Sequence, residues 1–287
     1  MYIVLSKFLF YDSTITNTNG DDNLQRTYLS DYHMHSKYSF DANQSIEEII
    51  LKAISMELNE ICLTEHISFD PEDTSYKFFD FKDYGNEIQR LSQKYQGKIN
   101  IKKGLEVGEY NLYKEDFDNY FKEHDLDFII GSIHNLNEKG LRTNISENGV
   151  SATYETYFKE ILKLAQMGDF DVLGHLDLVQ RYAFEAGGVY NFEDYKDYIY
   201  EILKIIISRG KGIEVNTSGL ANNLLFPKLE ILHMYKDLKG EILTVGSDAH
   251  TSNRVGEKIS YVYDILRDIG FKYIFTFDKR KTNGIIL

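Results

Sequence analysis

The stretch Asp31-Tyr32-His33-Met34-His35 is a short strand-like run that ends in two histidines separated by one residue. Alternate residues of a strand point to the same face, so these two imidazoles would lie together and could bind one ion. Further along the chain, other short apolar runs end in the same way, in a histidine or a carboxylate. This repeated pattern, an apolar run closed by a residue that binds metals, decides the fold.

Short apolar runs alternate with longer segments of helical period from Ser30 onward. The predicted strands are Asp31–His35, Glu60–Thr64, Ile99–Glu106, Phe128–Ser132, Val172–His175, Gly212–Asn216 and Ile242–Ser247, with Tyr273–Phe277 as an optional eighth. Such alternation is typical of βαβ units and a parallel sheet. Seven or eight units in about 250 residues, with no GxGxxG after the first strand, favour a closed or nearly closed barrel over an open doubly wound sheet.

Two segments between the predicted strands carry a clear helical stripe. Residues 46–54 repeat isoleucine and alanine at positions i, i+3, i+4, i+7 and i+8, directly after Ser45 as an N-cap. Residues 199–206 repeat the same apolar spacing. We therefore expect amphipathic helices in both segments, each packed with one face on the barrel.

Six of the eight histidines, together with three acids, lie at or just after the ends of the predicted strands. The C-terminal ends of parallel barrel strands converge on one face, so these side chains would come within reach of the same ions. One histidine at a strand end is more often a hydrogen-bonded rim residue, but six such placements favour a metal site. The predicted ligands are His33, His35, Asp41, His66, Glu106, His134, His175, Asp248 and His250.

Three other residues of metal-binding type are assigned no role in this site. His124 and His233 lie on helix-like segments, where a surface or packing histidine is the expected interpretation. Cys62 lies inside an apolar run and is expected to be an inert buried thiol. Since it is the only cysteine, no intrachain disulfide can form, and no secretory signal is recognisable, so we expect a cytoplasmic protein.

Composition limits the partners of the chain. Its 287 residues carry 32 Lys and Arg against 45 Asp and Glu, a formal charge of −13, which argues against binding to nucleic acid. No apolar run approaches the roughly 20 residues that span a bilayer, so no membrane partner is expected. We expect one catalytic domain over residues 30–287, preceded by an extension of unknown role over residues 1–29. A homo-oligomer is compatible with this sequence.

The motifs resemble the PHP (polymerase and histidinol phosphatase) metallohydrolases, and among them the stand-alone histidinol-phosphatases. The resemblance covers about Ser30 to Phe277. It rests on seven ordered motifs: HMH (33–35) with SFD (39–41), TEH (64–66), GLEVG (104–108), GSIH (131–134), GHLD (174–177), EVNTSG (214–219) and GSDAH (246–250). It implies a distorted (β/α)7 barrel, similar to a TIM barrel, that holds three divalent ions (zinc, manganese or iron) at the C-terminal ends of its strands.

The resemblance also implies how the ligands divide among the ions. The first site would hold His33, His35, Glu106 and Asp248; Glu106 would bridge to a second site with His134 and His175; Asp41, His66 and His250 would form the third. Some relatives carry a histidine where this chain has Asp41, so harder ions such as Mn²⁺ or Fe²⁺ suit the third site better. Glu106, Asp248 and His250 are expected nearest to the reaction.

A cluster of cations with imidazole and carboxylate ligands suits the hydrolysis of phosphate esters, because the ions bind the phosphate oxygens and make hydroxide available near neutral pH. Phosphate also needs fixed cationic contacts, for which Arg181 is the first choice and Arg254 the second. Glu109, with Glu65 and Asp177 as alternatives, could bind a positive group of the substrate or orient a ligand histidine.

The activity implied by the resemblance is hydrolysis of histidinol phosphate to histidinol and phosphate, a step of histidine biosynthesis. One alternative is another phosphoesterase of this fold that acts on a nucleotide, a phosphotyrosine protein or another phosphate ester. A second is a metal-binding module without catalysis, which would be expected to lack some ligands. A third is an amidohydrolase-type barrel, which would place a bridging lysine on a middle strand, where this chain has Glu106.

Overall fold

The computed structural model describes residues 27–287, so the predicted extension over residues 1–29 lies almost wholly outside the described residues. Within this range, seven parallel strands form one sheet in the order β1-β2-β3-β4-β7-β8-β9. Their bounds are β1 (Ser30–Asp31), β2 (Glu60–Ile67), β3 (Asn100–Gly108), β4 (Phe128–Ser132), β7 (Val172–Leu173), β8 (Gly212–Asn216) and β9 (Leu243–Gly246). All seven overlap predicted strands, although β1 shares only Asp31 with the predicted strand Asp31–His35.

The first and last strands of the sheet meet and nearly close the barrel. The N–H of Tyr32 donates to the carbonyl of Val245 at 2.9 Å, and the N–H of Asp248 donates to the carbonyl of His33 at 2.8 Å. Regular pairing in β1 covers only two residues, but Met34, just beyond it, forms a parallel bridge with Ala249, just beyond β9. The predicted fold, a seven-stranded α/β barrel, is therefore confirmed.

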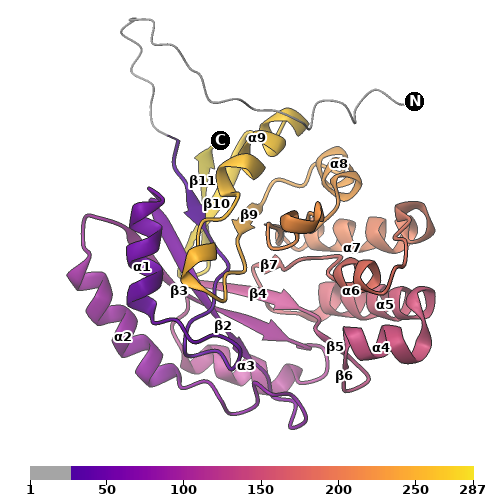
Figure 1. Ribbon diagram of the computed structural model, residues 1–287, viewed down its shortest axis with the longest axis horizontal. Coiled ribbons are helices and arrows are strands. Elements are labelled where there is room, and N and C mark those ends of the chain that lie inside the picture. Colours follow the sequence, from indigo (N-terminus) through magenta and orange to yellow (C-terminus); the bar gives the residue numbers. More distant parts are fainter. Residues whose placement is uncertain (1–26) are drawn as a thin grey trace, which may run out of the picture.

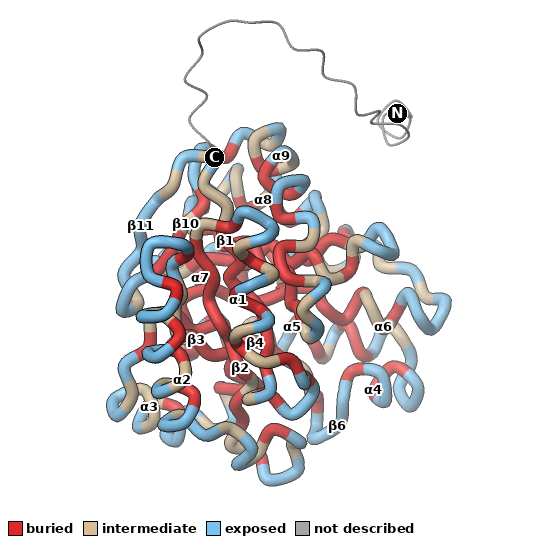
Figure 2. The backbone as a smooth tube through the Cα atoms, turned by 60° about the vertical axis from the view of Figure 1, so that its left-hand side comes forward, coloured by how far each residue is buried: buried red, intermediate tan, exposed pale blue. Residues whose placement is uncertain are grey.

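Helices surround this barrel on its outer side (Figure 1), and the buried chain lies within the ring that they form (Figure 2). They are α1 (Ile46–Ser55), α2 (Phe81–Lys94), α3 (Lys114–Glu123), α4 (Leu141–Asn148), α5 (Val150–Met167), α6 (Val179–Glu185), α7 (Lys196–Ser208), α8 (Leu229–Asp237) and α9 (Ile259–Ile269). Among the described residues, no helix is both long and apolar enough to cross a membrane.

The two predicted amphipathic helices are α1 and α7. Ser45 caps α1 with a reciprocal pair of hydrogen bonds: its hydroxyl accepts from the N–H of Glu48 at 3.2 Å, and the Glu48 carboxylate accepts from the N–H of Ser45 at 2.7 Å. The apolar stripes of both helices are buried against the barrel, as expected. The side chain of Ile54 is the partial exception, since it is half-buried.

The predicted eighth strand exists, but it does not join the barrel sheet as expected. Residues Tyr273–Asp278 do form a strand, β10, but it pairs antiparallel with β11 (Lys281–Ile286) outside the barrel sheet. The reason is the two-residue turn between them: Lys279 and Arg280 both have positive φ, 48° and 62°, which is the geometry that folds one strand back on the other.

This hairpin covers the N-terminal ends of the barrel strands, which we call the closed end. The ring of Phe277 lies 4.8 Å from that of Phe128, between ring centroids, and Tyr32 packs against both. The guanidinium of Arg280 pairs with Asp169 at 2.8 Å. The hairpin is thus held against the barrel by packed aromatic rings and by an ion pair.

Short elements complete the chain. The strands β5 (Asn135–Leu136) and β6 (Lys139–Gly140) form a small antiparallel hairpin after β4. Three single 3-10 turns lie at η1 (Phe192–Asp194), η2 (Leu220–Asn222) and η3 (Ser252–Arg254). The η2 and η3 turns follow β8 and β9, on the side of the barrel where the predicted ligands end their strands.

Candidate metal centre

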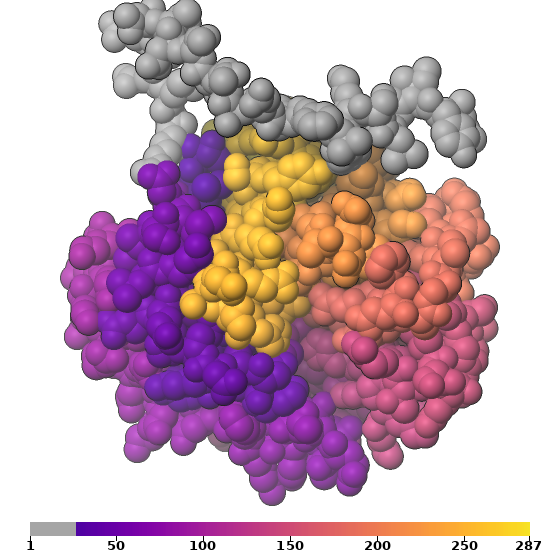
Figure 3. Space-filling model, viewed as in Figure 1, coloured from indigo at the N-terminus to yellow at the C-terminus, as the bar shows by residue number. Residues whose placement is uncertain are grey.

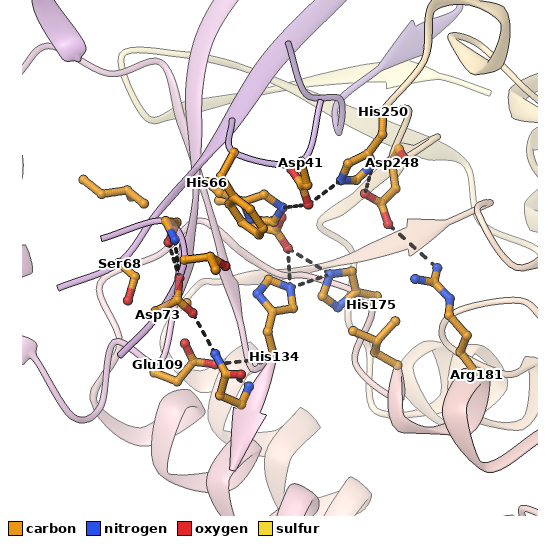
Figure 4. A pocket seen from close by; sticks show the side chains of 18 of the residues that line it. Asp41, His66, Ser68, Asp73, Glu109, His134, His175, Arg181, Asp248 and His250 are labelled. Carbon is orange, nitrogen blue, oxygen red and sulfur yellow. Dashed lines mark hydrogen bonds and ion pairs between the residues drawn. The ribbon is translucent and has the colours of Figure 1, made fainter. Parts of the chain in front are cut away.

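All nine predicted ligands gather at the C-terminal ends of the barrel strands, which we call the ligand end. Figure 4 labels those that line the cavity most openly: Asp41, His66, His134, His175, Asp248 and His250. Potential ligand atoms lie within 4.8 Å of one another in four groups: His33–His35–Glu106, Glu106–His134–His175, His33–His175–Asp248 and His35–His66–His250. These groups share members, so the residues form one continuous cluster. The convergence predicted from the strand ends is therefore present.

Glu106 lies at the centre of the cluster. Its Oε1 is 2.8 Å from Nε2 of His175 and 3.2 Å from Nε2 of His134. Its Oε2 is 3.0 Å from Nε2 of His33 and 3.2 Å from Nδ1 of His66. Each oxygen thus faces a different set of histidines, which is the arrangement that a carboxylate bridging two ions requires.

Asp41 joins the cluster from the loop after β1. Its Oδ2 lies 3.1 Å from Nε2 of His250 and 3.4 Å from Nε2 of His66. The ring of His35 lies 4.2 Å from that of His66 and 4.3 Å from that of His250, between centroids. Asp41 is about one-third exposed, so this side of the cluster is the one that solvent and a ligand can reach.

Charges inside the cluster keep its acids ionised. Burial by itself would raise the pKa of Glu106, but the neighbouring histidines, His33 first, hold that pKa well below its ordinary value. The pKa of Asp248 is held low in the same way, against the effect of burial. Conversely, burial would lower the pKa of His250, but its hydrogen bond to Asp41 raises it to about 9. The carboxylates of the cluster are therefore anionic, and the imidazoles beside them stabilise their charge.

The donor set fits divalent ions. The Nε2 atoms of His33 and His35 are 3.1 Å apart, and those of His134 and His175 are 3.4 Å apart. Two facing imidazole nitrogens can share at most one proton favourably, whereas a cation turns both lone pairs into ligand bonds. Since Glu214 accepts from Nδ1 of His33 at 2.6 Å, Nε2 of that ring is left as the lone-pair nitrogen toward the cluster.

Glu214 is a functional residue that the sequence analysis did not place. Its Oε1 accepts from the ring of His33, and its Oε2 accepts from the N–H of His175 at 2.8 Å. Its side chain is completely buried inside the barrel. The sequence contained one signal of this role: Glu214 lies in the middle of the predicted strand Gly212–Asn216, and a buried carboxylate needs a hydrogen-bond partner.

Glu65 and Asp177 lie away from the pocket, and their contacts are internal. Both side chains are buried. Glu65 accepts from the hydroxyls of Ser36 and Ser39, each at 2.6 Å, and Ser39 in turn lies 3.2 Å from Nδ1 of His35. Asp177 accepts from the N–H of Lys228 at 3.1 Å. Of the two interpretations left open by the sequence, the geometry favours orientation of neighbouring groups over contact with a substrate.

A cavity of about 230 Å³ lies over the cluster, and the surface is hollowed where the indigo and yellow segments meet the orange and pink ones (Figure 3). Arg181, from α6, lines it. Its guanidinium lies 5.0 Å from the centre of the Phe226 ring, donates to the hydroxyl of Ser218 and comes within 3.8 Å of Asp248. Arg181 is therefore a fixed cation at the edge of the metal centre.

Arg254, the second predicted phosphate contact, does not line this cavity. Its Nε donates to Glu257 at 2.8 Å and its Nη2 donates to the carbonyl of Ser218 at 3.0 Å. Both arginines thus contact Ser218, one through the hydroxyl and one through the backbone. The geometry places Arg254 behind the residue that holds Arg181.

Glu109 lines the cavity at the end of β3. Its Oε1 accepts from the N–H groups of His134 and Asn135, at 2.7 and 2.8 Å, while its Oε2 is buried without a hydrogen-bond partner. Its backbone is left-handed, with φ of 49°, as is that of Asp248 with φ of 53°. Non-glycine residues adopt this conformation at a cost, and such residues concentrate at functional sites.

The residues that the sequence analysis excluded lie outside the cluster. The ring of His124 stacks on Phe81 with centroids 4.0 Å apart. His233 is exposed on α8. Cys62 is fully buried, and burial raises the pKa of its thiol. A packing role for His124, a surface role for His233 and an unreactive thiol are the interpretations that this geometry supports.

The family model for the PHP domain matches residues 31–218, which hold most of the strands and seven of the nine predicted ligands. The chain belongs to the PHP domain family.

Proteins with sequences similar to this chain include histidinol-phosphatases. The histidinol-phosphatase of Lactococcus lactis is 29% identical over 88% of this chain and 95% of its own length. The probable histidinol-phosphatase of Clostridium acetobutylicum is 31% identical over 87% of this chain and 97% of its own. A crystal structure of the Lactococcus lactis histidinol phosphate phosphatase, complexed with zinc, L-histidinol and phosphate, superposes with a TM-score of 0.81 at 27% identity, covering 90% of this chain and 99% of that one.

Proposed function

We propose that this protein is a metal-dependent phosphoric monoester hydrolase that converts L-histidinol phosphate to L-histidinol and phosphate, a step of histidine biosynthesis. The observation that carries the proposal is the cluster around Glu106, in which imidazole and carboxylate groups from different barrel strands converge within ligand distance. The relatives named histidinol-phosphatase match nearly the whole of this chain, which supports the same substrate.

We propose that three divalent ions, zinc, manganese or iron, bind at the ligand end. The proposed ligands are His33, His35, Glu106 and Asp248 for the first ion, Glu106, His134 and His175 for the second, and Asp41, His66 and His250 for the third. When bound, such ions polarise a phosphate ester and lower the pKa of water to near neutrality. Zinc is present in the Lactococcus lactis structure.

The protein's own groups hold the reacting centre in place. Glu106, Asp248 and His250 are proposed as the residues nearest to the reaction, since all three line the cavity beside the cluster. Arg181 is proposed to bind two phosphate oxygens, because its planar guanidinium matches that geometry and is already fixed by Ser218. Residues 30–287 would then form the catalytic unit.

The second candidate function is another phosphoesterase of this family, and the same experiment separates the two. Phosphate release is measured from L-histidinol phosphate beside sugar, nucleotide and tyrosyl phosphates, with protein loaded in turn with Mn²⁺, Zn²⁺ and Fe²⁺. We expect a preference for histidinol phosphate of at least about a hundredfold in kcat/KM, or about 2.7 kcal/mol. A comparable rate on another ester would assign the protein to that substrate instead.

A further inference from the structure

The hydroxyl of Ser39 contacts two of the proposed metal ligands at once. Ser39 lies in the loop after β1, two residues before Asp41. Its Oγ lies 3.2 Å from Nδ1 of His35 and accepts from the backbone N–H of His66 at 3.0 Å. Ser39 is only 1% exposed, so both contacts are shielded from water. One buried hydroxyl therefore joins a residue of the first proposed ligand set to a residue of the third.

The third partner of this hydroxyl is the carboxylate of Glu65, which is not among the proposed ligands. The Ser39 hydroxyl donates to Oε2 of Glu65 at 2.6 Å. The hydroxyl of Ser36 donates to Oε1 at 2.6 Å, and the N–H of Ser36 donates to Oε2 at 2.9 Å. Three donor groups thus converge on a fully buried carboxylate, which is the acceptor in each of these contacts.

The contacts of Ser39 decide which nitrogen of His35 carries the proton. A serine hydroxyl has one proton and two lone pairs. Its proton goes to Glu65, because a carboxylate only accepts, and one lone pair takes the N–H of His66. The remaining lone pair can only accept, so the Nδ1 of His35 that faces it is the protonated nitrogen.

With its proton on Nδ1, the ring of His35 presents the lone pair of Nε2 to the cluster. That nitrogen lies 3.4 Å from Oδ1 of Asp248 and 3.5 Å from Oε2 of Glu106. These two carboxylates belong to the same proposed ligand set as His35. The proton that Ser39 holds on one side of the ring therefore frees the nitrogen on the other side to bind an ion.

The two histidines of the first ligand set are oriented in different ways. His33 contacts a carboxylate directly, since its Nδ1 lies 2.6 Å from Oε1 of Glu214. His35 reaches its carboxylate, that of Glu65, only through the hydroxyl of Ser39. Removal of this one hydroxyl would leave the buried Nδ1 of His35 without its acceptor.

We infer that Ser39 is a positioning residue of the metal centre, whose hydroxyl connects Glu65 to His35, fixes Nε2 of that ring as the ligand atom and holds the backbone of His66 beside it. This inference rests on the metal centre of the proposed function. A polar group that orients a ligand histidine in this way commonly contributes about tenfold to a hundredfold to metal affinity.

The first test is spectroscopic and uses the zinc-loaded protein with nitrogen-15-labelled histidine. We expect the His35 ring of the wild type to carry a proton on Nδ1 that exchanges slowly with water, because that proton is buried and hydrogen-bonded. In S39A the same proton should exchange faster, because its acceptor is gone. A wild-type His35 ring protonated on Nε2, or an unchanged exchange rate in S39A, would overturn the inference.

The second test measures zinc affinity by competition with a chelator, with circular dichroism as the check of the fold. S39A should bind zinc at least about tenfold more weakly than the wild type. S36A is the matched control, because it removes the other hydroxyl from Glu65 but none from a ligand histidine. Its zinc affinity should stay within about threefold of the wild type.

E65Q tests the same connection from its other end. It should weaken zinc binding, since the amide can donate to the Ser39 hydroxyl and turn its proton toward His35. In a protein that already carries S39A, E65Q should weaken zinc binding no further.

The outcomes separate this role from general loosening and from the proposed function. An S39A protein with the zinc affinity of the wild type, or equal losses in S39A and S36A, would overturn the inference. Neither test uses a substrate. A wild type that binds zinc and shows the expected His35 proton, but does not hydrolyse histidinol phosphate, would contradict the proposed function alone.

Discussion

The two ends of one barrel differ in almost every physical respect although the same strands build both. At the ligand end, the strands finish in histidines and acids that face one another within ligand distance. At the closed end, the interior is apolar and is made of Tyr32, Cys62, Phe128, Ile130, Val172 and Phe277. The difference indicates that chemistry is concentrated at the C-terminal ends of the strands and stability at the N-terminal ends.

Two buried acids, Glu106 at the ligand end and Asp171 at the closed end, differ in the same way. At the ligand end, neighbouring histidines hold the pKa of Glu106 well below its ordinary value, even though burial opposes this. At the closed end, burial raises the pKa of Asp171 to about 6, although Arg280 lies 3.2 Å away. The histidine cluster therefore stabilises the negative charge of Glu106, whereas burial opposes the negative charge of Asp171.

The largest effect is expected from E106Q at the ligand end. The neutral amide cannot bridge two ions, so kcat/KM should fall by at least about a thousandfold, with loss of bound metal. Activity on histidinol phosphate and metal content by elemental analysis are the measurements, and circular dichroism checks the fold. Full activity with a full complement of metal would show that Glu106 has no bridging role.

The F277A variant at the closed end is expected to lose stability but to keep most of its catalytic activity. Removing this buried ring should lower the free energy of unfolding by about 3 kcal/mol, because it leaves a cavity against Tyr32 and Phe128. Urea unfolding measures the loss, and kcat/KM per folded molecule should stay within about twofold.

Tyr273 provides the matched control on the same strand, since its side chain is 46% exposed. Y273A should cost less than about 1 kcal/mol. If F277A removed activity from protein that is still folded, the separation between the two ends would be wrong.

A smaller effect is expected from S218A, which removes the hydroxyl that holds Arg181. The Ser218 hydroxyl donates to Oδ1 of Asn216 at 2.5 Å, so its lone pair is free to accept from the guanidinium. We expect a loss of about tenfold in kcat/KM, the size of one hydrogen bond to a charged group. In a protein that already carries R181A, the same change should cost nothing further, and additive losses would refute this positioning role.

The sequence predicted the barrel and the ligand cluster because both follow from local pattern. Strand-sized apolar runs that end in histidine or acid, such as the run that ends at His175, need only the geometry of a parallel barrel to converge. Glu106 illustrates this, because its place at the end of an apolar run already marks it as a residue that faces the other strand ends.

What the sequence could not predict depends on long-range contacts and loop conformation. The hairpin of β10 and β11 looks like one more barrel strand until the turn at Lys279 and Arg280 is seen to fold it back. Ser39 lies in a loop without periodicity, and only the structure brings its hydroxyl to Glu65. Glu214 belongs to the EVNTSG motif, but its contact with His33 spans 181 residues of chain and cannot be inferred from the motif.

The most direct test of the metal centre is a crystal structure of the protein grown with Mn²⁺ and phosphate, with anomalous diffraction recorded for the metal. We predict three anomalous peaks, one at each proposed ligand set, two of them beside Glu106, with the phosphate between the metal ions and Arg181. Peaks that leave Glu106 without a metal neighbour, or a phosphate bound away from Arg181, would contradict this prediction.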